Sequence, residues 1–120
     1  MTEAQLLRNI IGPKCNNLCA VFHWRSFHVR PALVSKGGKL VYRTAVQGGG
    51  VGFPDLVLVS RKPWHPRPRV LYRELKSDED DLSPDQKVWY DLLKAARQDV
   101  AIWRPKDWEL IVATLTPCKV

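Results

Sequence analysis

The 120-residue sequence predicts a single α/β domain over residues 1–120, with a mixed β-sheet flanked by helices. Apolar residues at helical spacing come first, then several β-branched runs, then helix, strand and helix again. The composition, 45% hydrophobic and 26% charged, is an ordinary balance for a chain with one core. No apolar stretch approaches the roughly 20 residues of a membrane span, and the N-terminus lacks a signal-peptide pattern. We therefore expect a soluble cytoplasmic protein without membrane contact.

The first half of the chain predicts one helix followed by strands. Thr2 and Gln5 fit a capping box, so a helix should begin there and end at Gly12-Pro13. Runs rich in aromatic and β-branched residues predict strands or hairpins at 18–29, 40–46 and 56–59. The Gly-rich sequences "SKGGK" and "QGGGVG" predict the turn and the loop between them.

The second half predicts strands and two further helices. Ser83, Pro84 and Gln86 supply the cap, the first-position proline and the capping-box partner of a helix. Its expected apolar face consists of Val88, Trp89, Leu92, Leu93 and Ala96. The other expected elements are a loop at 61–69, strands at 70–77 and 100–103, an acidic solvated turn at 78–81 and a helix at about 106–115.

The net charge of +7 is unevenly distributed. Residues 1–73 contain 12 Lys or Arg and only two acids, Glu3 and Asp55, a balance of 12 − 2 = +10. This predicts a polyanionic partner, most often nucleic acid, and a basic surface kept for solubility is the alternative. The three cysteines, Cys15, Cys19 and Cys118, lack a metal-binding pattern and are expected to be reduced thiols.

Charged residues stand in two apolar runs, where a lone buried charge would be costly. Asp55 opens the run "LVLV", and Glu74 and Lys76 lie two residues apart in the next strand-like run. Side chains alternate along a strand, so Glu74 and Lys76 share a face, and Leu75 points the other way, against a helix. If the two strands pair, Asp55, Glu74 and Lys76 converge.

This cluster suits hydrolysis at phosphorus with a divalent metal ion. Two neighbouring carboxylates raise one pKa, and a hard cation removes that conflict. Mg²⁺ favours oxygen ligands and usually keeps several waters, one of which could attack phosphorus. Lys76 could orient that water or help to remove its proton. The alternative is an exposed ion pair of Glu74 and Lys76, worth about 0–1 kcal/mol.

Four motifs resemble those of a known nuclease family. Pro54-Asp55 with Glu74-Leu75-Lys76 is similar to the PD-(D/E)xK signature, and the wider string over residues 52–112 resembles the VRR-NUC family. These are small virus-type nucleases, found as stand-alone phage and bacterial proteins and as modules of larger repair enzymes. The motifs are Gly-Phe-Pro-Asp-Leu at 52–56, Glu-Leu-Lys at 74–76, Leu-Ser-x-x-Gln at 82–86 and Trp-Arg-Pro-x-Asp at 103–107.

The resemblance implies roles for individual residues. Asp55, Glu74 and the backbone carbonyl of Leu75 would hold the metal ion. An acid on the first helix can complete the metal shell, which matches Glu3; an ordinary first-turn acid is the alternative. Lys76 would support catalysis. Gln86 would face the site, in addition to or instead of capping its helix.

The resemblance also implies a restriction-endonuclease-like core and metal-dependent cutting of DNA. Mg²⁺ is the expected cofactor, with Mn²⁺ able to substitute. The expected function is a structure-selective DNA endonuclease that hydrolyses phosphodiester bonds, similar to a Holliday-junction resolvase. Two symmetric cuts in a four-way junction require a homodimer with twofold symmetry. A phage-encoded member would work in the host cytoplasm.

Several basic residues are candidates to bind DNA. Arg61, Lys62, Arg67 and Arg69 lie in the proline-rich loop and are expected to contact phosphates, unless the loop is only solvated. Arg73 stands where family members often have a small or apolar residue, so we expect it at an exposed edge or against DNA.

The sequence leaves alternative roles for two aromatic residues, and it also leaves alternatives to the expected function. Trp64 could stack on a base or pack against the protein, and His23, expected in a strand, could approach the site. The first alternative function is a nuclease with the same site acting on flaps, single strands or branched DNA. The others are a non-catalytic nucleic-acid-binding protein and a structural or inhibitory phage protein.

Overall fold

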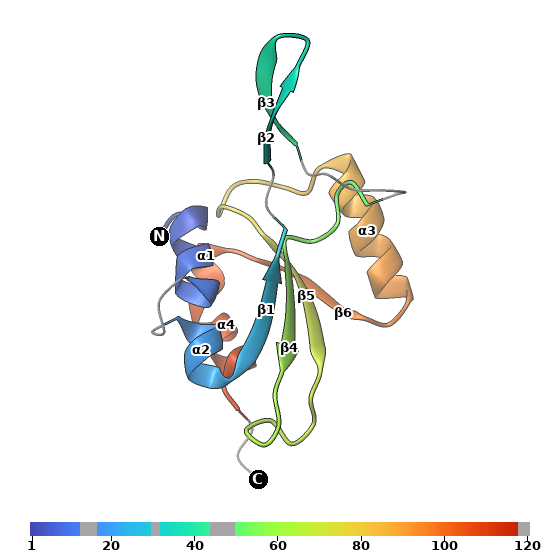
Figure 1. Cartoon of the computed structure of the whole chain (residues 1–120). Coiled ribbons are helices and arrows are strands. Elements are labelled where there is room, and N and C mark those ends of the chain that lie inside the picture. Colours follow the sequence, from blue (N-terminus) through green and yellow to red (C-terminus); the bar gives the residue numbers. More distant parts are fainter. Residues whose placement is uncertain (13–16, 30–31, 44–49, 118–120) are drawn as a thin grey trace.

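The computed structural model describes residues 1–12, 17–29, 32–43 and 50–117, which form a four-stranded sheet flanked by helices (Figure 1). The strand order is β1-β4-β5-β6. β1 pairs with β4 and β4 with β5 in antiparallel fashion, and β5 pairs with β6 in parallel. The strands are β1 (Trp24–His28), β4 (Leu56–Ser60), β5 (Val70–Leu75) and β6 (Asp99–Trp103). The predicted mixed sheet with flanking helices is therefore confirmed.

The core lies between one face of this sheet and three helices, which Figure 1 shows on the same side. These are α1 (Glu3–Ile11), α2 (Leu18–Phe22) and α4 (Trp108–Leu115), with the short helix η1 (Pro105–Asp107) before α4. The fully buried side chains that meet there are Leu6, Ile10, Leu56, Leu58, Leu71, Ile111 and Leu115. Burial of these residues fixes which face of β4 and β5 is turned away from the core.

The helix α3 (Pro84–Ala95) lies on the other side of the sheet (Figure 1). Its start is the predicted one, because the Ser83 and Gln86 side chains each accept from the other's backbone N–H. Its predicted apolar face is only partly used. Val88 and Leu92 are exposed, so that expectation was wrong for them, whereas Trp89 packs edge-on against Phe53 at 5.0 Å between ring centroids.

The segment 18–29 was predicted as a strand or hairpin, but it begins as the helix α2. Asn17 caps this helix, since its side chain accepts the backbone N–H of Ala20 at 3.0 Å. Cys19 is buried against the core, and burial raises the pKa of its thiol to about 12. Packing and a cap therefore override the β-propensity of this stretch. Cys15 and Cys118 lie outside the described residues.

A separate hairpin, β2 (Ala32–Lys36) and β3 (Lys39–Arg43), projects from the body of the molecule (Figure 1). Its two strands pair only with each other among the described strands. Gly37 and Gly38 form the predicted turn, with φ of 58° and 78°, values that favour glycine. Of the strand expected at residues 40–46, residues 40–43 belong to β3, and residues 44–46 lie outside the described residues. Over the described ranges, no helix is long and apolar enough to cross a membrane.

Candidate active site

The register of β4 and β5 brings Asp55 beside Glu74. Leu56 lies opposite Arg73 in this antiparallel pair, so the next position of each chain sets Asp55 opposite Glu74. Side chains of directly opposed residues lie on the same face, with Cβ atoms about 5 Å apart. The carboxylate of Asp55 also accepts the backbone N–H of Leu75, with Oδ2 3.0 Å from the nitrogen. The two carboxylates therefore meet at one end of the sheet.

The rest of the Glu-Leu-Lys motif is arranged by the end of β5. Leu75 is buried in the core, where Leu6 and Ile10 of α1 also lie, so the prediction that it faces a helix is confirmed. Lys76 follows the strand, and its backbone N–H donates to the Trp103 carbonyl at 3.1 Å. This bond continues the parallel pairing of β5 with β6 by one residue and fixes the start of the Lys76 side chain.

The electrostatics of the site reflect crowded acids. The pKa of Glu74 is raised to about 9, first by burial and then by the hydrogen bond and negative charge of Asp55, whereas Lys76 acts in the opposite direction. Burial and Asp55 also raise the pKa of Glu3, which Lys76 lowers. Glu3 of α1 therefore lies within electrostatic reach of both Asp55 and Lys76.

Gln86 contributes a hydrogen bond to the site from the first turn of α3. Its Nε2 donates to Oε1 of Glu74 at 3.0 Å, while its Oε1 accepts the backbone N–H of Ser83 at 2.8 Å. The residue thus caps the helix and contacts the site at once. The two roles that the sequence left open are both present.

Gly52 holds the first turn of α3 against the site, a role that sequence reasoning missed. Its φ is +86°, and a Cβ atom there would lie 2.4 Å from the backbone carbon of Asp85 and 2.7 Å from the nitrogen of Gln86. Only glycine permits such close contact. The next residue, Phe53, packs edge-on against Trp89. Gly52, three residues before Asp55, therefore keeps the first turn of α3, which carries Gln86, close to the Asp55 carboxylate.

Arg104 organises the turn after Lys76, and its role was also missed. Its Nη1 donates to the Ser77 carbonyl at 2.7 Å and to the Asp80 carbonyl, and its Nη2 lies 3.7 Å from Oδ1 of Asp81. The backbone N–H of Arg104 is held by Asp107 at 2.9 Å. The motif Trp-Arg-Pro-x-Asp was the available signal, but its spacing does not reveal which turn the guanidinium contacts.

The donor set fits a hard divalent cation. In the ranges that the structure describes, no three His, Cys, Asp or Glu side chains already form a cluster of metal-ligand geometry. However, the buried Glu74 carboxyl lies beside the Asp55 carboxylate, and burial together with Asp55 raises the pKa of Glu74. An ion bound by both carboxylates would remove this repulsion.

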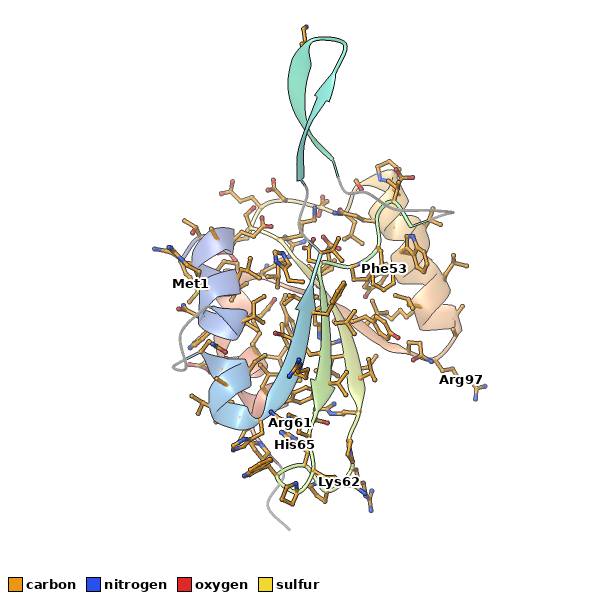
Figure 2. All side chains as sticks on the ribbon, viewed as in Figure 1. Met1, Phe53, Arg61, Lys62, His65 and Arg97 are labelled. Carbon is orange, nitrogen blue, oxygen red and sulfur yellow. The ribbon has the colours of Figure 1, made fainter. Side chains whose placement is uncertain are left out.

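The basic loop at 61–69 lies at the opposite end of the sheet from Asp55. The five residues of β4, at about 3.3 Å per residue, separate Asp55 from Arg61 by about 20 Å. Figure 2 shows Arg61 and Lys62 at this far end, away from Phe53. Arg61, Lys62 and Arg67 are exposed, and Arg69 is half-exposed but bonded to Asp99 and to the Thr114 carbonyl. The structure does not bring these residues to the carboxylates.

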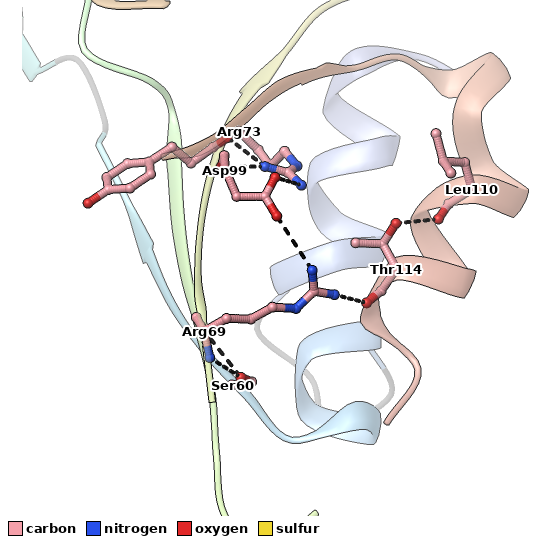
Figure 3. A network of polar contacts seen from close by, with 7 residues as sticks. Ser60, Arg69, Arg73, Asp99, Leu110 and Thr114 are labelled. Carbon is pink, nitrogen blue, oxygen red and sulfur yellow. Dashed lines mark hydrogen bonds and ion pairs between the residues drawn. The ribbon is translucent and has the colours of Figure 1, made fainter. Parts of the chain in front are cut away.

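Arg73 does not lie at an exposed edge, so that expectation was wrong. β5 is an interior strand, and Arg73 is only 4% exposed on the core face. Its Nη2 binds Oδ1 of Asp99 at 2.9 Å, and its Nη1 donates to the carbonyls of Tyr72 and Asp99 (Figure 3). Its guanidinium lies 4.8 Å from the centre of the Trp103 ring. In this position its role is structural, not one of DNA contact.

His23 does not approach the carboxylates either. It is the C-cap of α2, with φ of 64°, and its ring stacks on Trp64 of the basic loop at 3.9 Å. The expected strand at this position was wrong, because the chain needs a left-handed residue between α2 and β1.

Comparison with models of protein families matches residues 5–107 to the VRR-NUC domain. The matched range includes Asp55, Glu74, Lys76 and Gln86, whereas Glu3 precedes it. Comparisons with curated proteins and with solved structures found no match. Because the matched range covers most of the 120 residues and contains all four motifs, the chain belongs to the VRR-NUC family, a family of PD-(D/E)xK-type nucleases.

Proposed function

We propose that this protein is a divalent-metal-dependent endodeoxyribonuclease, selective for branched DNA such as four-way junctions. The observation that carries the proposal is the meeting of Asp55, Glu74 and Lys76 at one end of the sheet, where Asp55 bridges to the backbone of Leu75. Two carboxylates and a lysine in a partly buried site match the needs of phosphodiester hydrolysis. The positive charge of the chain favours a polyanionic substrate.

The residues that would hold the metal ion are Asp55 and Glu74, with the backbone carbonyl of Leu75 and the carboxylate of Glu3. Mg²⁺ suits this all-oxygen set, and Mn²⁺ can replace it. When bound, the ion supplies positive charge that neutralises the charge developing on the phosphate. Gln86 keeps Glu74 in place through the bond to its Oε1.

Lys76 orients the attacking water and helps to remove its proton. As the water oxygen bonds to phosphorus, the bond from phosphorus to the 3′ oxygen breaks, and that oxygen takes up a proton. The products are a 5′-phosphate and a 3′-hydroxyl. Removal of the ammonium group would therefore impair the chemical step more than substrate binding.

Each chain carries one such site, so resolution of a four-way junction requires two chains. A homodimer with twofold symmetry would present two sites to two symmetric phosphates. The expected products are paired nicks at equivalent positions on opposing strands.

The experiment is cleavage of a labelled four-way junction beside matched linear duplex, flap, branched and single-stranded DNA. Each would be incubated with Mg²⁺, Mn²⁺ or EDTA, using the native chain and Lys76→Ala. Paired symmetric nicks that disappear in EDTA and in the variant support the proposal. Cutting of flaps or single strands alone would reject junction selectivity and keep the active site.

A matched control is Lys106→Ala, because Lys106 is an exposed lysine outside the cluster. It should cut the junction like the native chain. Intact DNA under every metal condition, with binding preserved, would reject the enzyme and favour a non-catalytic binding protein.

A further inference from the structure

The basic loop at 61–69 presents an aromatic side chain to solvent. Trp64 is 46% exposed, and its ring stacks on His23 with 3.9 Å between centroids and 11° between planes. We call this pair the Trp64–His23 platform. The buried tryptophans, Trp24 and Trp103, belong to the core, whereas Trp64 does not. Its stacking on His23 therefore fixes the ring without hiding it.

Bonds from the body of the protein hold the platform in place. His23, the C-cap of α2, accepts the backbone N–H of Arg61 at 3.2 Å, and Arg61 in turn accepts the N–H of His65 at 3.0 Å. The His65 side chain is buried, with Nε2 2.6 Å from the Phe22 carbonyl and its ring edge-on to Trp24 at 5.0 Å. Both rings of the platform are thus positioned before any ligand arrives.

Exposed basic side chains lie on the same loop as Trp64. Arg61, Lys62 and Arg67 are exposed on the same short loop, whereas Arg69 is engaged by Asp99 and Thr114. A fixed aromatic ring beside basic side chains is the combination by which proteins bind single-stranded nucleic acid: bases stack on the ring, and cations contact phosphates. Paired bases in a duplex offer no free face to such a ring.

We propose that the Trp64–His23 platform binds an unpaired base of a single-stranded nucleic acid, with Arg61, Lys62 and Arg67 contacting its phosphates. The platform is about 20 Å from Asp55, which corresponds to about six base pairs of duplex at 3.4 Å per step. A strand cut at the carboxylates could therefore reach the platform with an unpaired segment. This use in selecting substrates rests on the proposed nuclease function, but the binding itself does not.

The first experiment measures binding of a labelled oligothymidylate by fluorescence anisotropy in EDTA, where no cleavage occurs. Trp64→Ala should weaken binding about five- to hundredfold, the range found when a stacking residue is removed. Trp64→Phe keeps a ring and should retain most of the affinity. Trp64→Leu keeps apolar volume without a ring and should bind as weakly as the alanine variant.

The matched control is Phe27→Ala, which removes another exposed aromatic ring, 63% exposed on β1. It should bind the oligonucleotide like the native chain. Equal binding by native chain and Trp64→Leu, or equal weakening by Phe27→Ala, would overturn the proposal. Because the leucine and phenylalanine variants keep the site filled, a folding defect of the alanine variant does not decide the outcome.

The second experiment separates stacking from charge through salt dependence. Arg67→Ala should reduce the slope of log K against log salt by about 0.7, the value per phosphate contact for a single strand. Trp64→Leu should lower affinity while leaving the slope unchanged, because a ring releases no counterions. A slope unaffected by Arg67→Ala would reject the phosphate contact.

The outcomes for the two proposals remain distinguishable. Lys76→Ala should bind the oligonucleotide like the native chain, because Lys76 follows β5 at the end of the sheet that carries Asp55, about 20 Å from the platform. A native chain that binds the oligonucleotide but cuts nothing would reject the nuclease and keep the platform. If the native chain cuts junctions and Trp64→Leu binds the oligonucleotide as tightly as the native chain, the platform is rejected and the nuclease is kept.

Discussion

Gln86 joins α3 to the carboxylate cluster through a single side chain. Its Nε2 lies 3.0 Å from Oε1 of Glu74, and its Oε1 accepts the N–H of Ser83 at 2.8 Å. An amide can do both because it is donor and acceptor at once. The start of the helix therefore also determines where Glu74 is held.

This double role predicts different results for two substitutions. Gln86→Glu keeps an acceptor for Ser83, so the capping box persists and the melting temperature should change little. It loses the donor to Glu74 and adds negative charge beside it, so cleavage should fall about tenfold or more. Gln86→Ala should lose activity and also about 0.5–1.5 kcal/mol of stability. Thermal unfolding and junction cleavage, measured together, test this; equal stability losses in both variants would contradict it.

The raised pKa of Glu74 predicts how stability depends on pH without metal. Between its ordinary pKa of 4.5 and the folded value of about 9, the folded protein binds more protons at Glu74 than the unfolded chain. The stability present below pH 4.5 is therefore lost as the pH rises through about 9. In EDTA, the melting temperature should fall over this range.

A divalent ion should counteract this loss, because it binds the ionised carboxylates. Added Mg²⁺ should raise the melting temperature more near pH 9 than near pH 6. Glu74→Gln is the control, since it removes the titrating group and should flatten both effects. A native protein whose metal response is the same at the two pH values would contradict a cation site at these carboxylates.

Gly52 predicts a long-range effect on the site. Gly52→Ala places a Cβ against the backbone of Asp85 and Gln86 and also strains a residue at φ +86°. We expect a loss of about 2–4 kcal/mol in stability and reduced cleavage, because α3 must move. Gly38→Ala is the matched control, because the φ of Gly38 is +78° and nothing lies within 4 Å of the added Cβ atom. It should show strain of about 1 kcal/mol and normal cleavage; equal effects on cleavage would argue against contact with α3 as the cause.

Arg104 predicts a positioning effect on Lys76. Arg104→Ala removes the donors to the Ser77 and Asp80 carbonyls, so the turn after Lys76 should loosen and kcat should fall with little change in KM. Asp81→Asn removes only an ion pair to a carboxylate that is almost fully exposed, and should be nearly silent. Kinetics on a junction with both variants measure the difference. A similar loss of kcat in both would assign the effect to charge instead of to the turn.

The sequence predicted the elements whose signals are local. Capping boxes at Thr2 and Ser83 located two helices because the interacting groups are three residues apart. The pairing of Asp55 with Glu74 could be anticipated from strand alternation and from the motif spacing. The fold class followed from the same patterns.

The remaining features depend on contacts between distant residues. The start of α2 is decided by Asn17 and by burial of Cys19, which outweigh β-propensity. The Arg104 side chain binds carbonyls of a turn that lies more than 20 residues away in sequence. The expectation that Arg73 lies at an edge failed because a charge within an apolar run does not reveal which strands pair with it. Nor does it reveal that the Asp99 carboxylate lies next to the guanidinium.

Arg73 and Asp99 provide a last prediction, about stability alone. Asp99→Ala leaves the buried guanidinium without its carboxylate, although two carbonyl bonds remain. Because Asp99 is itself half-exposed, we expect a loss of about 1–3 kcal/mol in urea unfolding. Arg73→Met should cost less, since an apolar side chain of similar length suits a site where, among the described residues, Nε of Arg73 lacks a partner. The double variant should be no less stable than Asp99→Ala; strictly additive losses would show that the two residues do not stabilise the fold through each other.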